Sequence, residues 1–121
     1  MKLNVTRKKK LGGGSYIYWV ITGTNREAFA KYHGLSIGWA KQDMYGVPIT
    51  RMDMDELDTQ GKRINPGETL ELDVKDDAAV FVCTGNGVLS NEIVLDGTIT
   101  QIEIVTEGGM KCITHPIVKA M

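Results

Sequence analysis

Cysteine, histidine and proline are scarce in this chain of 121 residues, which contains two cysteines, two histidines and three prolines. Two cysteines are too few for the disulfide framework of a small secreted domain, so we expect reduced thiols and a cytoplasmic protein. Long apolar runs are also missing, because none approaches the roughly 18–20 residues that a helix needs to cross a membrane. We therefore expect no membrane partner.

An excess of charge of one sign is lacking too, because 14 basic and 15 acidic residues leave a formal net charge of -1. This balance is not that of a polycation built for phosphate backbones. The charges are unevenly placed, with basic residues crowding 7–10 and acidic residues crowding 53–58. Since 42% of the residues are hydrophobic and the length is that of one domain, we expect a single domain over residues 1–121 with one modest core.

Alternation with a period of two residues is the main pattern along the chain. Leu3 and Val5 alternate with polar residues at the start, and Leu70 and Leu72 do so later. The segment "YIYWVIT", residues 16–22, is apolar on both faces and predicts a central strand that is covered on both sides. Turn signals separate these segments at Pro66-Gly67, Asp76-Asp77, Gly85-Asn86-Gly87, Asp96-Gly97 and Gly108-Gly109. Asp96-Gly97 in particular predicts a hairpin.

Short strands with turns about every eight to twelve residues are typical of a β-sandwich or a small barrel. We expect an all-β, single-domain antiparallel β-sandwich of the immunoglobulin-like kind, and a small OB-like β-barrel is the alternative. The basic first strand, the glycine-rich turn, the aromatic strand, "NPGETLELDV" and "LSNEIVL" together resemble small bacterial β-sandwich proteins. That resemblance implies the fold alone, and no functional residue is taken from it.

One short helix is predicted near residues 25–33, in the segment "TNREAFAKYHG". Thr24 and Glu27 have the spacing of a capping box, in which each side chain accepts from a backbone N–H of the other residue. Gly34 suits the left-handed conformation that ends many helices. By contrast, "RMDMDELD" alternates at Met52 and Met54 and favours a polar, exposed strand.

Cysteine catalysis needs a thiolate with a histidine beside it, and the chain holds Cys83, Cys112, His33 and His115. Cys83 lies in "VFVCT" and alternates with Phe81 on one face, as a small core residue does. We therefore expect Cys83 to pack in the core, and we predict no catalytic residues and no enzyme activity.

The sequence does not support a metal site either. Cys112 and His115 are three residues apart, and on a strand that spacing sends two side chains to opposite faces. The acidic segment from Asp53 fails as an EF-hand loop, because its sixth position is Asp58 and its twelfth is Ile64. We expect no metal and no cofactor.

Two groups of residues are candidates for binding. Three basic side chains precede two aromatic ones, an arrangement that an oligonucleotide-binding surface uses: Lys8, Lys9, Lys10, Tyr16 and Tyr18. Trp39 and Tyr45 lie in an irregular segment, where aromatic side chains often contact partners.

The function predicted from these observations is that of a non-catalytic structural or protein-interaction module. A protein partner, or self-association through strand edges, is favoured. The alternative is a domain that binds nucleic acid or another anionic ligand with its basic N-terminal segment and the adjacent tyrosines. Asn91 interrupts the apolar pattern of "VLSNEIVL" and would need a hydrogen-bond partner if it were buried.

Overall fold

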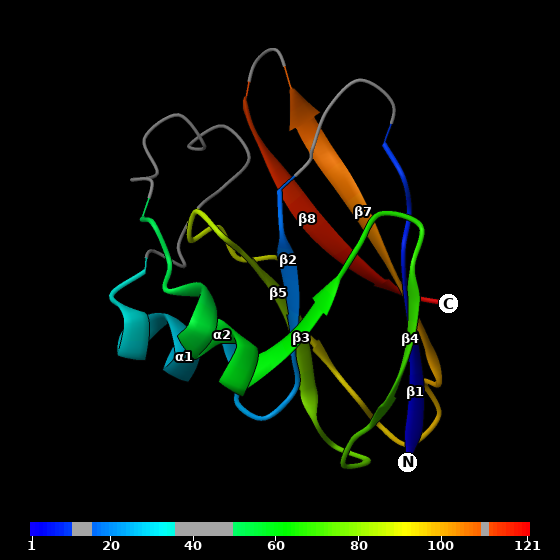
Figure 1. The fold of residues 1–121 in the computed structure, drawn as a ribbon. Helices are drawn as coiled ribbons and strands as arrows, with labels where there is room; N and C mark the ends of the chain where they lie inside the picture. Colours follow the sequence, from blue (N-terminus) through cyan, green and yellow to red (C-terminus); the bar gives the residue numbers. More distant parts are fainter. Residues whose placement is uncertain (11–15, 36–49, 110–111) are drawn as a thin grey trace.

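The computed structural model describes residues 1–10, 16–35, 50–109 and 112–121, and it shows a mostly β protein with two four-stranded sheets and two short helices (Figure 1). The elements in chain order are β1 (Lys2–Arg7), β2 (Tyr18–Ile21), α1 (Arg26–His33), α2 (Met54–Gln60), β3 (Gly61–Ile64), β4 (Thr69–Asp73), β5 (Ala79–Thr84), β6 (Ile93–Val94), β7 (Gln101–Gly109) and β8 (Cys112–Ala120). Neither helix in the described residues has the length and apolar character to cross a membrane.

The first sheet has the strand order β4-β1-β7-β8. Strand β1 pairs antiparallel with β4 and parallel with β7, so the expectation of a purely antiparallel protein was wrong. A parallel pair needs a long connection, and nearly the whole chain lies between β1 and β7. The second sheet has the order β3-β2-β5-β6, and over the described residues the two sheets form no closed barrel, which contradicts the OB-like alternative.

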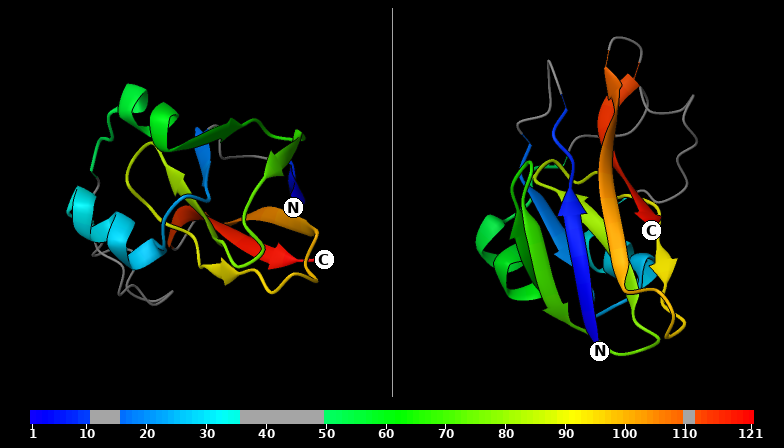
Figure 2. Two further views of the ribbon diagram at one scale, coloured as in Figure 1. Left: turned by 90° about the horizontal axis from the view of Figure 1, so that it is seen from below. Right: turned by 90° about the vertical axis from the view of Figure 1, so that its right-hand side faces the viewer.

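Strand β2 is central and covered on both faces, as its sequence predicted. All four of its residues are buried. Tyr18 and Val20 belong to the cluster between the two sheets, whereas Trp19 and Ile21 belong to a second cluster beneath the helices. The β3-β2-β5-β6 sheet therefore lies between the other sheet and the helices (Figure 2).

Buried side chains from both sheets form the cluster between them. Alternation explains the arrangement, because every second residue of β1, β5 and β7 points inward. The members are Leu3, Val5, Tyr18, Val20, Ile64, Val80, Val82, Leu95, Ile102, Ile104 and Val118. The cluster on the helix side consists of Trp19, Ile21, Phe29, Ala30, Met52, Leu57, Phe81, Cys83 and Leu89.

Helix α1 confirms the helix predicted near residues 25–33, with one correction at its start. Asn25 is the N-cap, and its side chain accepts from the amide of Ala28, so the capping box of Thr24 and Glu27 was wrong. The end is as predicted, because Gly34 adopts a left-handed conformation with a φ of 69°. The basic side chain of Arg26 ties the helix to the sheet through the carbonyl oxygen of Ser90 at 2.6 Å.

Helix α2 replaces the exposed strand predicted for "RMDMDELD", so that prediction was wrong. Asp53 is the N-cap, and its carboxylate accepts from the amides of Asp55 and Glu56 at 3.0 and 3.2 Å. Acidic residues in the first turn also suit the positive end of the helix dipole. Leu57 then lies buried beneath the helix, while Met54 is exposed.

Two turn predictions had different outcomes. The chain turns at Pro66-Gly67 as predicted, because the amide of Glu68 donates to the carbonyl oxygen of Asn65 and Gly67 has a φ of 81°. The hairpin at Asp96-Gly97 was wrong. A turn does form, with the carboxylate of Asp96 accepting from Thr98, but it leads the chain from β6 in one sheet to β7 in the other.

Candidate binding groove between the two helices

A groove with a volume of about 510 Å³ lies between α1 and the end of α2. It combines an aromatic wall with small residues and uncharged hydrogen-bonding groups. Its described lining consists of Gly23, Thr24, Ala28, Phe29, Tyr32, Thr59 and Gln60. This mixture of apolar surface and a few polar groups is typical of a binding site rather than of a loosely packed surface.

Tyr32 is the most exposed aromatic side chain of the groove, with 71% of its surface accessible. The carboxylate of Glu56 on α2 raises the pKa of Tyr32 above its usual value, through hydrogen bonding and through its negative charge. The phenol therefore stays protonated as a donor at neutral pH. The ring also makes an edge contact with His33, with centroids 4.8 Å apart and an interplanar angle of 80°. These contacts hold the exposed ring in place.

The side chains of His33 on α1 and Gln60 on α2 link the two helices beside the groove. His33 Nε2 and Gln60 Oε1 are 2.8 Å apart. On the sheet side, Phe29 contacts the ring of His33 with centroids 4.5 Å apart and the ring of Phe81 with centroids 5.3 Å apart. Contacts between Tyr32, His33, Phe29 and Phe81 thus run from the groove surface to strand β5, so the aromatic wall is anchored in the sheet.

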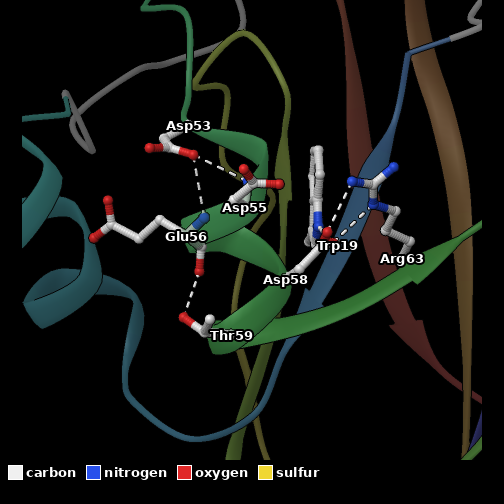
Figure 3. A network of polar contacts seen from close by, with 7 residues as sticks. All are labelled: Trp19, Asp53, Asp55, Glu56, Asp58, Thr59 and Arg63. Atoms are coloured by element: carbon white, nitrogen blue, oxygen red, sulfur yellow. Dashed lines mark hydrogen bonds and ion pairs between the residues drawn. The ribbon is translucent and has the colours of Figure 1, made fainter.

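Helix α2 is fixed to the sheet by a polar network at its other side (Figure 3). Asp58 Oδ1 accepts from the indole Nε1 of Trp19 at 2.8 Å and from Nε of Arg63 at 2.7 Å. Arg63 Nη2 donates to Asp58 Oδ2 at 2.8 Å, which makes the ion pair bidentate. Figure 3 shows that Glu56 extends to the opposite side, toward α1. Two acidic residues of α2 therefore point to different sides, with Asp58 bound to Trp19 and Arg63 and Glu56 extended toward α1.

A second groove of about 450 Å³ adjoins the first. Both are lined by Gly23 and Thr24, which belong to the connection between β2 and α1. The second groove is also lined by the connection between β4 and β5, including Asp77 and Lys75. A ligand longer than one side chain could therefore contact both.

Lys8, Lys9 and Lys10 were predicted to bind nucleic acid, but in the structure they contact other groups of the same protein. Lys8 Nζ lies 3.6 Å from the carboxylate of Glu103, and Lys10 Nζ donates to the carbonyl oxygen of Gly108 at 2.6 Å. Lys9 lies beside Gly67 of the turn between β3 and β4. The positive charge of this segment is thus partly balanced by the protein itself.

The two tyrosines of that predicted surface differ in exposure. Tyr16 is 44% exposed, but Tyr18 is fully buried between the sheets and its hydroxyl group lies 2.8 Å from that of Thr106. The stacking platform of Tyr16 and Tyr18 was therefore wrong, because Tyr18 is a core residue. The other two candidates, Trp39 and Tyr45, lie outside the described residues.

Arg7 is a buried cation that was not predicted from the sequence, although the alternation of β1 places it on the same inward face as Leu3 and Val5. Its guanidinium donates to the carbonyl oxygens of Ile64 and Tyr16 at 3.0 Å each. The same group lies 3.6 Å from the centre of the Tyr18 ring. Burial lowers the pKa of Arg7. These contacts join β1 to β3 and to the residues before β2, so Arg7 holds the two sheets together.

Cys83 is fully buried, as predicted, in the cluster beneath the helices. Burial raises the pKa of its thiol to about 12, so the thiol stays protonated and is a poor nucleophile at neutral pH. Cys112 and His115 both lie in β8. Within the residues that the structure describes, no three His, Cys, Asp or Glu side chains gather as a metal site would require.

Comparisons of the chain with protein-family models, with curated proteins and with solved structures find no match. The groove residues were not predicted from the sequence. Two local signals point toward them: Phe29 and Tyr32 lie three apart on α1, and Asp53 precedes Glu56 by three, the spacing of a helix cap.

Proposed function

We propose that this chain is a non-catalytic interaction module that binds a protein partner through the groove between α1 and α2. The single observation that carries the proposal is the groove, with its exposed Tyr32 and its uncharged polar rim. Tyrosine is among the residues that dominate binding energy at interfaces, because it buries a large area at a small cost in conformational entropy. The contacts that hold Tyr32 and His33 reduce that cost further.

The proposed scaffold is a β-sandwich of the immunoglobulin-like kind. Its support is the core between the sheets, to which strands of both four-stranded sheets contribute. We also propose a cytoplasmic location, which the free, buried thiol of Cys83 supports. Fractionation of cells that express the tagged chain tests this, and recovery outside the cytoplasm would contradict it.

Selection of short peptides from a random library tests the groove. The matched variants are Gly23→Leu and Thr100→Leu. A Cβ added at Gly23 meets no atom within 4 Å, and the φ angle of this glycine is not positive. We therefore expect leucine at this position to fill space in the groove without disturbing the core. Thr100 is exposed and lies outside the groove.

We expect selected peptides to lose binding to Gly23→Leu and to retain it with Thr100→Leu. Peptides that bind both variants equally would contradict the groove as the binding site. A library that yields no binder to the wild-type chain would also contradict it.

Nucleic-acid binding is the weaker proposal, because Lys8 and Lys10 already contact Glu103 and Gly108. A fluorescence-anisotropy titration with oligonucleotides at two salt concentrations tests it. Affinity that weakens steeply with added salt would support it, since phosphate contacts release counterions. Flat anisotropy at both salt concentrations would end it.

Self-association through strand edges is the second form of the interaction proposal. Strand β4 is the edge of one sheet and carries exposed Glu71 and Asp73. Two copies of β4 would bring these like charges together, which disfavours pairing. Light scattering over a range of concentrations tests it. A dimer would support it, whereas a constant monomer mass would leave a different protein as the partner.

A further inference from the structure

We propose that the groove takes a lysine side chain from an extended segment of the partner protein, with the ammonium group against the Tyr32 ring and the Glu56 carboxylate. This inference rests on the proposed function of the groove and adds the chemistry of its ligand. It arises from the carboxylate of Glu56, which acts on Tyr32 beside the uncharged lining of the groove, and from the exposure of the Tyr32 ring.

Charge complementarity favours a cation. None of the described residues that line the groove is basic. Helix α2 carries Asp55, Glu56 and Asp58, and no basic residue lies in its last turn. Asp58 is already bound by Arg63 on the far side of the helix, whereas Glu56 extends toward α1. Glu56 is therefore the carboxylate that a cation in the groove would meet.

Glu56 has capacity for such a ligand. A carboxylate offers two oxygen atoms and about four acceptor positions, so Glu56 can accept from a ligand as well as act on Tyr32. An ammonium group carries three donors on a flexible stem, so it can reach the remaining positions. The contact stays half-exposed, which makes it sensitive to salt.

Tyr32 supplies the second contact. Its ring is 71% exposed, and its edge contacts the ring of His33 with centroids 4.8 Å apart. A cation over the face of a tyrosine is attracted by the negative potential of the ring. The methylene groups of a lysine would meanwhile contact the apolar part of the wall, which Ala28 and Phe29 form.

An extended segment, rather than a free amine, suits the adjoining groove. The two grooves share Gly23 and Thr24, and the charged residues that line the second are Asp73, Lys75 and Asp77. Residues that flank the lysine would lie there. The backbone of such a segment could use the hydroxyl group of Thr24, and its amides could donate to Oγ1 of Thr59, whose own proton is donated to the carbonyl oxygen of Glu56 at 2.6 Å.

The experiment uses the peptides selected for groove-dependent binding. Each lysine of the best peptide is replaced in turn by norleucine, which keeps the stem and removes the charge. Fluorescence anisotropy measures the binding of the original lysine peptide and of each norleucine peptide to three proteins: the wild-type chain, Glu56→Gln and Glu71→Gln. The last variant removes the same charge from exposed β4, far from the groove lining.

We expect one norleucine replacement to weaken binding to the wild-type chain about three- to thirtyfold, and Glu56→Gln to weaken the lysine peptide by a similar factor. Binding of the norleucine peptide should not change further with Glu56→Gln, because the pair is already lost. Glu71→Gln should bind as the wild type does, and Tyr32→Leu should weaken the lysine peptide.

Other outcomes separate the two proposals. Peptides that lose binding to Gly23→Leu but contain no lysine, or that are indifferent to Glu56→Gln, would overturn the cation inference and leave the groove function standing. Peptides that are indifferent to Gly23→Leu would overturn both. A loss of affinity equal in Glu56→Gln and Glu71→Gln would show general charge attraction and would also overturn the inference.

Discussion

The side chain of Asn91 pairs with both polar backbone groups of Val118. Its Nδ2 donates to the carbonyl oxygen of Val118 at 2.9 Å, and its Oδ1 accepts from the amide of Val118 at 2.9 Å. Asn91 lies just before β6 of one sheet, whereas Val118 lies in β8 at the edge of the other. The amide thus offers β8 the donor and acceptor that a neighbouring strand would offer, and it joins the sheets on that side.

Replacement of Asn91 by alanine should lower the free energy of unfolding by about 1–2 kcal/mol, because two hydrogen bonds are lost while water can reach part of the site. Urea denaturation measures this change. Gln101→Ala, at an exposed position of β7, should stay within about 0.5 kcal/mol of the wild type. Equal stability of the Asn91 and Gln101 variants would contradict the role of the amide.

The ionised carboxylate of Asp58 should make the free energy of unfolding decrease as the pH becomes acidic. Its bonds from Arg63 and then from Trp19 hold the pKa of Asp58 below its usual value. The folded state is therefore favoured above the unfolded-state pKa of about 4, and this stabilisation is lost as the pH falls through the folded-state pKa.

Asp58→Asn should be less stable than the wild type at pH 7, and the difference should be smaller at about pH 3, because this pH lies below the unfolded-state pKa of about 4 and the stabilisation by the ionised carboxylate is partly lost there. Urea denaturation followed by tryptophan fluorescence measures both values. Asp77→Asn, at an exposed turn, is the control. A difference that is the same at both pH values would show that the charge of Asp58 contributes nothing.

Local patterns predicted much of the fold. The alternation of Leu3 and Val5 and the turn at Pro66-Gly67 depend on neighbours in sequence, and the structure confirms both. The partner of each strand could not be predicted, because the parallel pair of β1 and β7 joins residues about a hundred apart. The turn at Asp96-Gly97 shows the same limit, since its local geometry does not decide which sheet the next strand joins.

Ambiguity of pattern explains the strand predicted around Met52 and Met54. Two alternating methionines fit a strand, but the carboxylate of Asp53 caps a helix, and Leu57 supplies its buried contact. The groove was beyond local reasoning, because it forms only where Tyr32 of α1 lies across from Thr59 and Gln60 of α2. The ion pair between Lys8 and Glu103 could not be predicted for the same reason, because Glu103 lies in β7, far from Lys8 in sequence.

The thiol of Cys83 should make the protein less stable in alkali. Burial raises its pKa to about 12, whereas an unfolded cysteine ionises near pH 8.5. The stabilisation is fully present below the unfolded-state pKa and is lost as the pH rises toward the folded-state pKa. In a Cys112→Ser background, which leaves one thiol, the loss should reach about 2 kcal/mol by pH 10.

A Cys83→Ala variant in the same background is the reference, because every other ionising group is shared. The unfolding free energy of each protein is measured by urea denaturation at pH 7.5 and at pH 10. The fall between these two pH values should be about 2 kcal/mol smaller for the Cys83→Ala variant than for the parent. Parallel curves for the two proteins would contradict the raised pKa. Rapid alkylation of Cys83 in the native protein at neutral pH would do the same.

Gly61 in β3 and Gly23 in the connection between β2 and α1 should respond differently to replacement by alanine. A Cβ at Gly61 would lie 2.5 Å from the carbonyl oxygen of Val20 and 2.5 Å from Cδ1 of Ile21. Because the first of these atoms is backbone in the paired strand β2, it cannot move aside without breaking the β2–β3 ladder. Gly61→Ala should therefore lower the free energy of unfolding by about 1–3 kcal/mol.

Gly23→Ala should remain within about 0.5 kcal/mol of the wild type, because a Cβ there meets nothing within 4 Å and its φ is not positive. Urea denaturation of both variants in one buffer makes the comparison. Strong destabilisation by Gly23→Ala would show that the connection between β2 and α1 is tightly packed, and Gly23→Leu could then no longer serve as a probe of the groove. A neutral Gly61→Ala would contradict the close approach of β3 to β2.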